Sequence, residues 1–241
     1  MPDMDVDLYL QTREKEGRLY ADDVVARLPH VPAGHPLADE WRARAASASR
    51  LTRYLSRRRD PLSILDLGCG NGWLSNLLSK TGQHIFGMDQ NCYELKQAAR
   101  VFLPAPGLLF FDGNIFLAPF STGTFDVIVL ASVIQYFDDL PALLSVLLNY
   151  LKPQGEIHII DSPFYSADEV QTAELRSRQY YASLGFAAMS KYYFHHRWSD
   201  LLMLDAKKLY RPVPLLLHLK RRLGWIDSPF PWIMIQKQGR E

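Results

Sequence analysis

A glycine-rich turn is the part of this chain whose residue types and spacing suggest chemistry most directly. The turn, Gly68-Cys69-Gly70-Asn71-Gly72, follows an apolar run, and Asp66 stands just before it. A dinucleotide-binding fingerprint would need glycine at position 73, where the chain has Trp73, and the Gly-Lys-Ser/Thr of a phosphate-binding loop is absent. A carboxylate beside the turn suits an ammonium group better than a pyrophosphate. We therefore expect a nucleoside ligand with an amino-acid end.

Two further carboxylates follow the next two apolar runs. Asp89 comes about 20 residues after the turn, a spacing that places a carboxylate on ribose hydroxyls. Asp112 follows the third run and is succeeded by Gly113 and Asn114. Because the carboxyl ends of parallel strands meet at one edge of a sheet, these groups are expected to converge there. Acidic groups at successive strand ends suit a neutral or cationic nucleoside better than a phosphorylated one.

Three residues are candidates for work on a second substrate. Gln135 cannot act as a base at neutral pH but can orient an acceptor, and Tyr136 can donate or accept a hydrogen bond. His195 is a candidate base, although His196 beside it would point to the opposite face of a strand. All three candidates follow runs that are expected to be strands.

Two other titratable residues leave their roles open. His158 lies inside an expected strand and is interpreted as a core histidine rather than a catalytic one. Asp161 follows that strand, where it could either contact substrate or cap a turn.

An alternation of strands and helices must position these residues. Strands are expected at 62–67, 83–88, 108–111, 125–130 and 156–160, with helices at 93–102 and 140–151. In the tail we expect a helix at 168–184 and strands near 188–194 and at 232–236, the last antiparallel. Ahead of the sheet, residues 38–59 have helical spacing. The pattern predicts a doubly wound, mostly parallel α/β sheet in residues 61–241, after an N-terminal helical extension in residues 1–60.

Five segments resemble, in order, the motifs of class I (Rossmann-like) S-adenosylmethionine (SAM)-dependent methyltransferases. They are ILDLGCGNG at 64–72, GMDQN at 87–91, FDGN at 111–114, FDVIVLASVIQYF at 125–137 and LKPQGEIHIID at 151–161. The resemblance implies a seven-stranded sheet with helices on both faces, SAM as cofactor and S-adenosylhomocysteine as product. Many relatives have a histidine pair where this chain has Gln135-Tyr136, which puts a histidine-base mechanism there in doubt.

The resemblance also implies roles for individual residues at the cofactor site. Gly68 and Gly70, within the turn that Cys69, Asn71 and Gly72 complete, would approach the methionine and ribose portions, and Asp66 would steer the ammonium group. Asp89 would hold the ribose diol, Gln90 would lie against the adenine, and Asp112 would accept from its amino group. Gly113 or Asn114 would add a backbone contact, and Ala131 and Ser132 would line the floor near the sulfonium.

Composition excludes several other classes of protein. The 241 residues have a formal net charge of +1, which does not indicate a general nucleic-acid binder. The two cysteines show no zinc-ligand or disulfide spacing, so no metal site is expected. Neither a signal peptide nor a membrane span is visible, which predicts a cytoplasmic protein.

Basic stretches and the N-terminal segment suggest further contacts. Arginines concentrate in 42–59 and basic residues in 207–222. These stretches could receive an anionic acceptor, and the apolar and basic segment 213–225 could touch a membrane surface, although ordinary solvated helices explain both patterns as well. The N-terminal segment could close over the ligands as a lid, although an ordinary packing helix with a solvated basic face explains it as well. Its polar and aromatic candidates are Tyr9, Arg18, Tyr20, His35, Trp41, Arg42 and Arg44.

The favoured function is methyl transfer to a small molecule, or to a glycan or lipid intermediate. The alternatives are an RNA or protein methyltransferase that uses the basic stretches, and a non-catalytic SAM-binding regulator. The Asn/Asp-Pro-Pro-Tyr/Phe motifs of base amino-group methylation are absent after the fourth strand, which disfavours a nucleic-acid substrate. The identity of the acceptor and the oligomeric state do not follow from the sequence.

Overall fold

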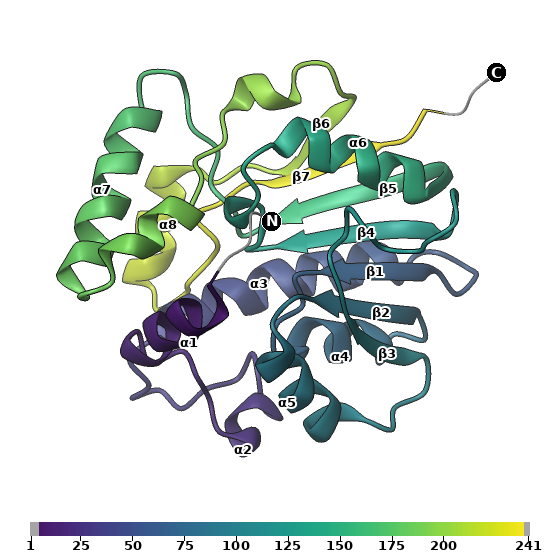
Figure 1. The fold of residues 1–241 in the computed structure, drawn as a ribbon, viewed down its shortest axis with the longest axis horizontal. Coiled ribbons are helices and arrows are strands. Elements are labelled where there is room, and N and C mark those ends of the chain that lie inside the picture. Colours follow the sequence, from purple (N-terminus) through teal and green to yellow (C-terminus); the bar gives the residue numbers. More distant parts are fainter. Residues whose placement is uncertain (1–4, 239–241) are drawn as a thin grey trace.

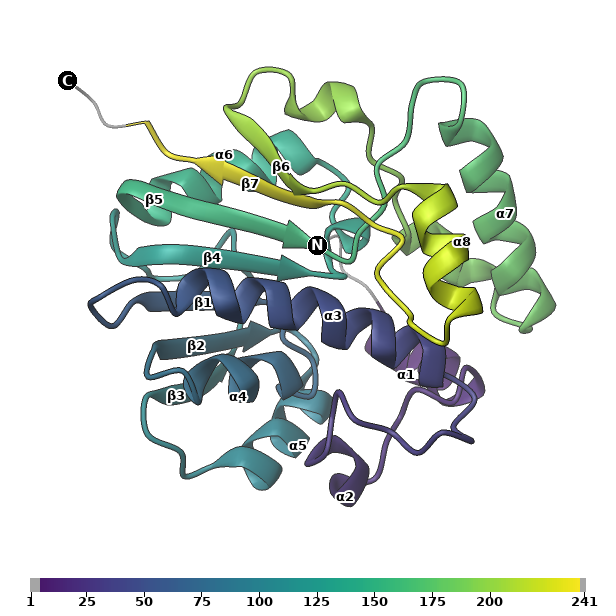
Figure 2. The same ribbon diagram turned by 180° about the vertical axis from the view of Figure 1, so that it is seen from behind.

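The computed structural model describes residues 5–238, which form one sheet with helices on both faces (Figures 1 and 2). In chain order the elements are α1 (Val6–Lys15), α2 (Asp22–Val25), α3 (Ala38–Leu55), β1 (Ser63–Leu67), α4 (Trp73–Ser79), β2 (His84–Asp89), α5 (Cys92–Phe102), β3 (Leu108–Asp112), β4 (Phe125–Ala131), η1 (Ile134–Tyr136), α6 (Leu140–Tyr150), β5 (Leu151–Ile160), α7 (Val170–Ser183), η2 (Ala187–Tyr192), η3 (Trp198–Leu201), β6 (Ala206–Tyr210), α8 (Pro214–Arg222) and β7 (Trp232–Gln236).

The seven strands follow the order β3-β2-β1-β4-β5-β7-β6. The first five are parallel, and β7 runs antiparallel to both of its neighbours. The strand order reverses between β1 and β4, and ligands bind beyond the carboxyl ends of the strands at such a switch point. The predicted doubly wound, mostly parallel seven-stranded sheet is therefore confirmed.

Side-chain alternation along the strands builds a core on each face of the sheet. Ile64 of β1 packs with the buried residues of α3 and α4, whereas Leu65 points to the other face and packs with those of α6. Figure 2 shows α3 crossing the face that it covers, and Figure 1 shows α6 over the opposite face. Packing on both faces of the sheet thus fixes the positions of the strand ends relative to one another.

One expectation for the tail was wrong, and one strand there was not predicted. Residues near 188–194 form the 3₁₀ helix η2 instead of a strand, and the seventh strand is β6, Ala206–Tyr210. β6 lies at the sheet edge and is mostly exposed, so its residues lack the apolar alternation that marks a buried strand. β5 begins at Leu151, five residues before the expected strand at 156–160, and residues 152–155 (Lys-Pro-Gln-Gly), for which a turn is an equally natural interpretation, belong to it, with an irregular pairing to β4.

The N-terminal helices contribute to the main core. Trp41, Ala48, Leu51 and Leu55 of α3 are buried against the sheet. The division of the chain at residue 60 remains a prediction. Among residues 5–238, no helix is both long and apolar enough to cross a membrane.

Candidate active site

The glycine turn after β1 has a backbone that only glycine adopts easily. Gly68 and Gly70 have φ of +73° and +52°. A Cβ on Gly68 would collide with the side chain of Val133 after β4. The turn is therefore packed tightly against the β4 loop, and a ligand can approach its backbone closely.

Asp89, at the end of β2, organises this turn. Its carboxylate accepts hydrogen bonds from the backbone N–H of Gly70 (2.8 Å) and of Asn91 (2.9 Å). Burial raises its pKa, while these backbone donors oppose the rise. Because an ionised carboxylate can accept about four hydrogen bonds, Asp89 retains capacity for two hydroxyl groups of a ligand.

A cavity, which we call the cofactor cavity, opens over this turn. Its lining includes eight of the predicted cofactor residues: Gly68, Cys69, Gly70, Asn71, Asp89, Gln90, Ala131 and Ser132. Five other predicted residues, Asp66, Gly72, Asp112, Gly113 and Asn114, are not part of this lining. The lining combines the backbone of the glycine turn with two carboxylates, Asp89 and Glu94, and three arginines, Arg13, Arg18 and Arg44. The carboxylates could receive the hydroxyl and ammonium groups of a nucleoside with an amino-acid end.

Asp66 and Asp112 have protein partners outside the cavity. Asp66 is buried on the α4 side of the sheet, where it accepts a hydrogen bond from Ser75 Oγ (2.6 Å). Burial raises its pKa to about 6. Asp112 accepts a hydrogen bond from Cys92 Sγ (3.0 Å). Asp66 therefore supports the glycine turn from beneath through α4.

Helix α1 closes the cofactor cavity from the N-terminal side. Tyr9 Oη donates to Glu94 Oε2 (3.5 Å), and Arg13 Nη2 donates to Tyr136 Oη (3.1 Å). The ring of Tyr9 meets that of Tyr136 edge-on. The cavity volume is about 130 Å³, less than the roughly 300 Å³ at the lower end for small-molecule sites. α1 must therefore move to admit a nucleoside.

Glu94 is a cavity residue that the sequence analysis missed. Burial raises its pKa to about 7, with a further rise from Asp89 and an opposing effect of Arg13. Its Oε2 accepts from Asn91 Nδ2 (2.9 Å). Asn91 and Glu94 have the spacing of a helix capping box, so the sequence signal indicates a helix start as readily as a binding residue.

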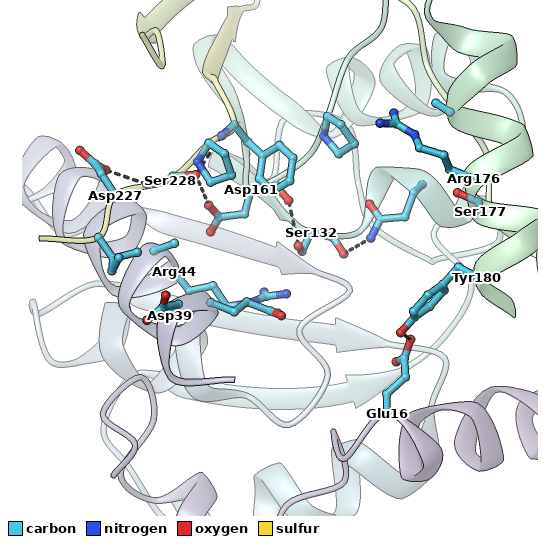
Figure 3. Close-up of a pocket in the computed structure, with 18 of the residues that line it drawn as sticks. Glu16, Asp39, Arg44, Ser132, Asp161, Arg176, Ser177, Tyr180, Asp227 and Ser228 are labelled. Atoms are coloured by element: carbon cyan, nitrogen blue, oxygen red, sulfur yellow. Dashed lines mark hydrogen bonds and ion pairs between the residues drawn. The ribbon is translucent and has the colours of Figure 1, made fainter. Parts of the chain in front are cut away.

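A second and larger cavity, the acceptor cavity, lies beside the first (Figure 3). Its volume is about 800 Å³, and α1, α3, α7, α8 and the ends of β4 and β5 contribute to it. The two cavities share five lining residues: Arg13, Arg18, Arg44, Ser132 and Tyr136. A group bound at this border could reach from one cavity to the other.

The walls of the acceptor cavity hold five arginines and five tyrosines together with five carboxylates, and four of the arginines form ion pairs with carboxylates. The arginines are Arg13, Arg18, Arg44, Arg176 and Arg221, and the tyrosines are Tyr136, Tyr165, Tyr180, Tyr181 and Tyr193. Arg18 and Arg44 both bind Glu40, through contacts of 2.6 Å and 3.0 Å. Burial raises the pKa of Glu40, but its two arginine partners outweigh that effect and lower the pKa to about 2. These walls present hydrogen-bond donors and aromatic surface together.

The floor between the cavities has a strained backbone. Ser132 after β4 and Asp161 after β5 have φ of +57° and +51°, a region that costs about 1–3 kcal/mol for a residue other than glycine. Ser132 Oγ donates to the Asp161 carbonyl (2.8 Å). Asp161 Oδ1 accepts from Ser47 Oγ (2.6 Å) and Ser228 Oγ (2.9 Å), and burial raises the pKa of this carboxyl. Its second oxygen, Oδ2, makes no hydrogen bond with residues 5–238.

Gln135 and Tyr136 lie on η1, beside this floor. Gln135 Nε2 donates to the carbonyl of Ser132 (2.7 Å), and its Oε1 is buried without a hydrogen-bond partner among residues 5–238. An unpaired buried acceptor costs about 1–3 kcal/mol. Gln135 Oε1, at the edge of the acceptor cavity, is therefore available to accept a hydrogen bond from a ligand.

The structure places the three histidines away from the shared floor. His195 lies in a separate surface cavity, with Nε2 2.9 Å from Ser177 Oγ. His196 is buried, with Nε2 2.8 Å from the carbonyl of Ile134. His158 is fully buried in the middle of β5. Neither cavity includes any of them in its lining.

A known sequence family matches most of the chain. The family described as "Methyltransferase domain" matches residues 38–198. This match covers α3, the glycine turn, Asp89 and the floor of both cavities.

Curated relatives match a shorter central part. The malonyl-[acyl-carrier protein] O-methyltransferase of Halalkalibacterium halodurans is 33% identical over 118 residues, which are 45% of this chain and 44% of that protein. The demethylmenaquinone methyltransferase of Lactococcus lactis is 31% identical over 106 residues, 42% of each chain. The chain thus spans less than half the length of these relatives.

A solved structure extends the likeness in fold to almost the whole chain. The structure of a geranyl diphosphate methyltransferase in complex with SAM superposes with a TM-score of 0.58 and covers 87% of this chain and 93% of that one. The sequence identity is 14%, so this likeness concerns the fold.

Proposed function

The chain belongs to the class I SAM-dependent methyltransferases, and from this premise we propose that it transfers the SAM methyl group to a small organic acceptor held in the acceptor cavity. The observation that carries this proposal is the contact between the two cavities. They share Ser132, Tyr136 and three arginines, and eight of the thirteen residues predicted to bind SAM line the smaller cavity. An acceptor and a methyl donor could therefore meet at that border.

The cofactor roles follow the lining of the smaller cavity. Gly68, Cys69 and Gly70 line that cavity and would face the amino-acid and ribose portions, Asp89 would accept from the ribose hydroxyls, and Gln90 would lie against the adenine. Asp66 acts through Ser75 and the turn. Asp112, Gly113 and Asn114 do not line this cavity. Their contacts with the adenine edge would form only when the cofactor binds.

SAM supplies an electrophilic methyl group on a sulfonium, and the protein has to align an acceptor with it. Gln135 Oε1 can accept a hydrogen bond from a hydroxyl or amine of the acceptor, because nothing else among residues 5–238 satisfies that oxygen. Tyr136 and Arg13 hold the border between the cavities. The lid α1 excludes water once it has closed.

Asp161 is the proton acceptor in this proposal. Two serines fix Oδ1, which leaves Oδ2 for the acceptor proton. Burial raises the pKa of the carboxyl, which makes its ionised form a stronger base. Gln135 and Tyr136 would then orient the acceptor, and the proposal gives no step to His195, which lies in a separate cavity beside Ser177.

The acceptor is a small molecule rather than a macromolecule. A space of about 800 Å³ lies within the range for small-molecule sites. Two relatives are named for transfer to a malonyl group on a carrier protein and to a demethylated quinone, so small acidic or phenolic acceptors are the first to try. Several arginine and tyrosine donors on the walls suit such groups.

The test combines SAM binding with methyl transfer. Calorimetry with SAM on the full chain should give a saturable isotherm. Incubation with methyl-labelled SAM and panels of carboxylic acids, phenols and quinols should label a small molecule. Labelling of bulk RNA or protein, with none of any small acceptor, would contradict the small-molecule proposal. Absence of SAM binding would contradict the methyl-transfer proposal as a whole.

A further inference from the structure

Helix α8 has an apolar side that is exposed to solvent. None of its nine residues is buried. Leu215, Leu216 and Leu219, together with Leu223 just after the helix, are between 46% and 78% exposed. Trp225 follows at 72% exposed. Figures 1 and 2 place α8 at the periphery, beside α7 and beyond the ends of the strands.

The helix has two different faces. At about 100° per residue, Leu215, Leu216, Leu219 and Leu223 fall on one side, which we call the leucine face. Leu217, His218 and Arg221 fall on the other side, and these three line the acceptor cavity. One side of α8 therefore serves the cavity, and the leucine face points away from it.

Basic residues are frequent in the segment that contains α8, although three of them form ion pairs: Lys207 with Asp205, Lys220 with Asp227 and Arg221 with Asp39. Between residues 206 and 225 the chain has six lysines and arginines and no aspartate or glutamate, in a protein whose net charge is only +1. Lys220 and Arg222 flank the leucine face on the helical wheel. Lys220 pairs with Asp227, while Arg222 forms no ion pair with any residue from 5 to 238.

We propose that α8 docks on the surface of an anionic phospholipid bilayer, with the leucine face and Trp225 among the acyl chains and the basic residues at the head groups. An amphipathic helix with apolar residues, a tryptophan and flanking cations is the usual design of such anchors. Basic residues near an anionic surface add to the binding. A second copy of the chain fits this face less well, because two such faces would bring like charges together.

Docking would set the acceptor cavity against the membrane. The inner side of α8 forms part of the wall of that cavity, and Trp225 belongs both to the lining and to the exposed apolar surface. An acceptor with an apolar tail could then enter directly from the bilayer and place its polar end near the shared floor. This last step rests on the proposed methyltransferase function, whereas the docking itself does not.

Co-sedimentation of the full chain with vesicles tests the docking without SAM or acceptor. Vesicles of phosphatidylcholine with about one third phosphatidylglycerol should bind the protein at low salt, and vesicles of phosphatidylcholine alone should bind it weakly. Leu215→Asp with Leu219→Asp should lower the partition coefficient more than tenfold. Arg222→Gln should lower it about fivefold, as expected for one basic residue near the surface.

Leu117→Asp is the matched control, since Leu117 is 81% exposed but lies in the connection between β3 and β4. This variant should bind vesicles like the parent. Circular dichroism and SAM calorimetry should show that every variant is folded. Failure of the parent to bind anionic vesicles would overturn the docking proposal and leave the methyltransferase proposal intact. An equal loss of vesicle binding in the Leu117 variant would also overturn the docking proposal. So would the finding that the parent is a dimer and that the leucine substitutions dissociate it.

Discussion

Strand β5 and the residue that follows it belong to polar clusters of opposite character. Within the strand, Glu156 and His158 are buried with partners from α3 and β7. At the carboxyl end, Asp161 lies on the floor between the two cavities. Asp161 is only five residues from Glu156 and three from His158 along the chain, so the contrast depends on their surroundings and not on their distance in sequence.

The hydrogen-bonding groups of the Glu156–His158 cluster find their partners within the protein. His158 Nδ1 accepts from Trp232 Nε1 (3.0 Å), so Nε2 carries the proton and donates to Glu156 (3.2 Å). Tyr54 Oη and Arg58 Nη2 also donate to Glu156. Burial lowers the pKa of His158 and keeps it neutral. Burial also raises the pKa of Glu156, but the donors outweigh that effect and lower it.

The polar groups near the carboxyl end of β5 are strained, incompletely hydrogen-bonded or shifted in pKa. Ser132 and Asp161 have left-handed backbones, Gln135 Oε1 lacks a donor among residues 5–238, and burial raises the pKa of Asp161. Strain and unpaired groups persist where the surrounding structure enforces them, typically at functional sites. The comparison teaches that the buried polar residues in and beside one strand divide into a structural set and a reactive set. The structural set has its hydrogen-bonding groups satisfied by the protein, and the reactive set does not.

The largest effect is expected from Asp161→Asn. The amide keeps the contacts to Ser47 and Ser228 but cannot take a proton, so kcat should fall about 100-fold or more. The folded protein raises the pKa of Asp161, so the native state holds its proton more tightly than the unfolded state does. The stability from this group is lost as pH rises through that pKa. The variant should therefore be at least as stable as the parent at pH 8 in urea unfolding. A marked loss of stability with unchanged kcat would place Asp161 in the structural set.

His158→Ala should show the reverse pattern. Loss of the ring leaves a cavity beside Trp232 and removes a partner of Glu156, and we expect a decrease of about 3 kcal/mol in the free energy of unfolding. Urea titration at pH 7.5 measures this change. The KM for the acceptor should be unchanged in the protein that remains folded. A stable variant that has lost activity would contradict the structural role.

Tyr9→Ala tests the lid. Tyr9 lines the cofactor cavity, so the substitution removes part of the wall that would close on bound SAM, together with the edge-on packing against Tyr136. SAM affinity should fall about tenfold, an effect of about 1.4 kcal/mol. Calorimetry gives the affinity, and Tyr93→Ala, which alters a half-exposed tyrosine on α5, is the control. Equal losses in both variants would contradict a specific role for α1.

The smallest effect concerns Glu94 and pH. Its pKa of about 7 means that the carboxyl becomes charged between pH 6 and 8, under the influence of Asp89, Arg13 and Tyr9 around it. An ionised Glu94 attracts the cationic cofactor, so SAM affinity should increase a few-fold from pH 6 to pH 8. Glu94→Gln should remove this dependence. Parallel pH profiles of the two proteins would rule out Glu94 as its source.

The sequence predicted the parts of the site that depend on short-range patterns. The glycine turn, Asp89 and the strand ends follow from apolar runs and their spacing, and the fold followed from the alternation of strands and helices. Long-range packing remained hidden. No local pattern indicates that Arg13 meets Tyr136, that Glu94 is more than a capping residue, or that His195 lies outside both cavities. The edge strand β6 was missed because exposure removes the apolar signal.

SAM calorimetry on Asp89→Ala beside His158→Ala tests the central claim most directly. Asp89 is the carboxylate of the reactive edge that organises the glycine turn, and His158 is buried in the structural cluster. Loss of two or more hydrogen bonds to a charged group should weaken SAM binding about 100-fold or more in Asp89→Ala. In His158→Ala the affinity should stay within about twofold of the parent. Unchanged affinity in Asp89→Ala, or a large loss confined to His158→Ala, would contradict the assignment of the cofactor site to the carboxyl edge of the sheet.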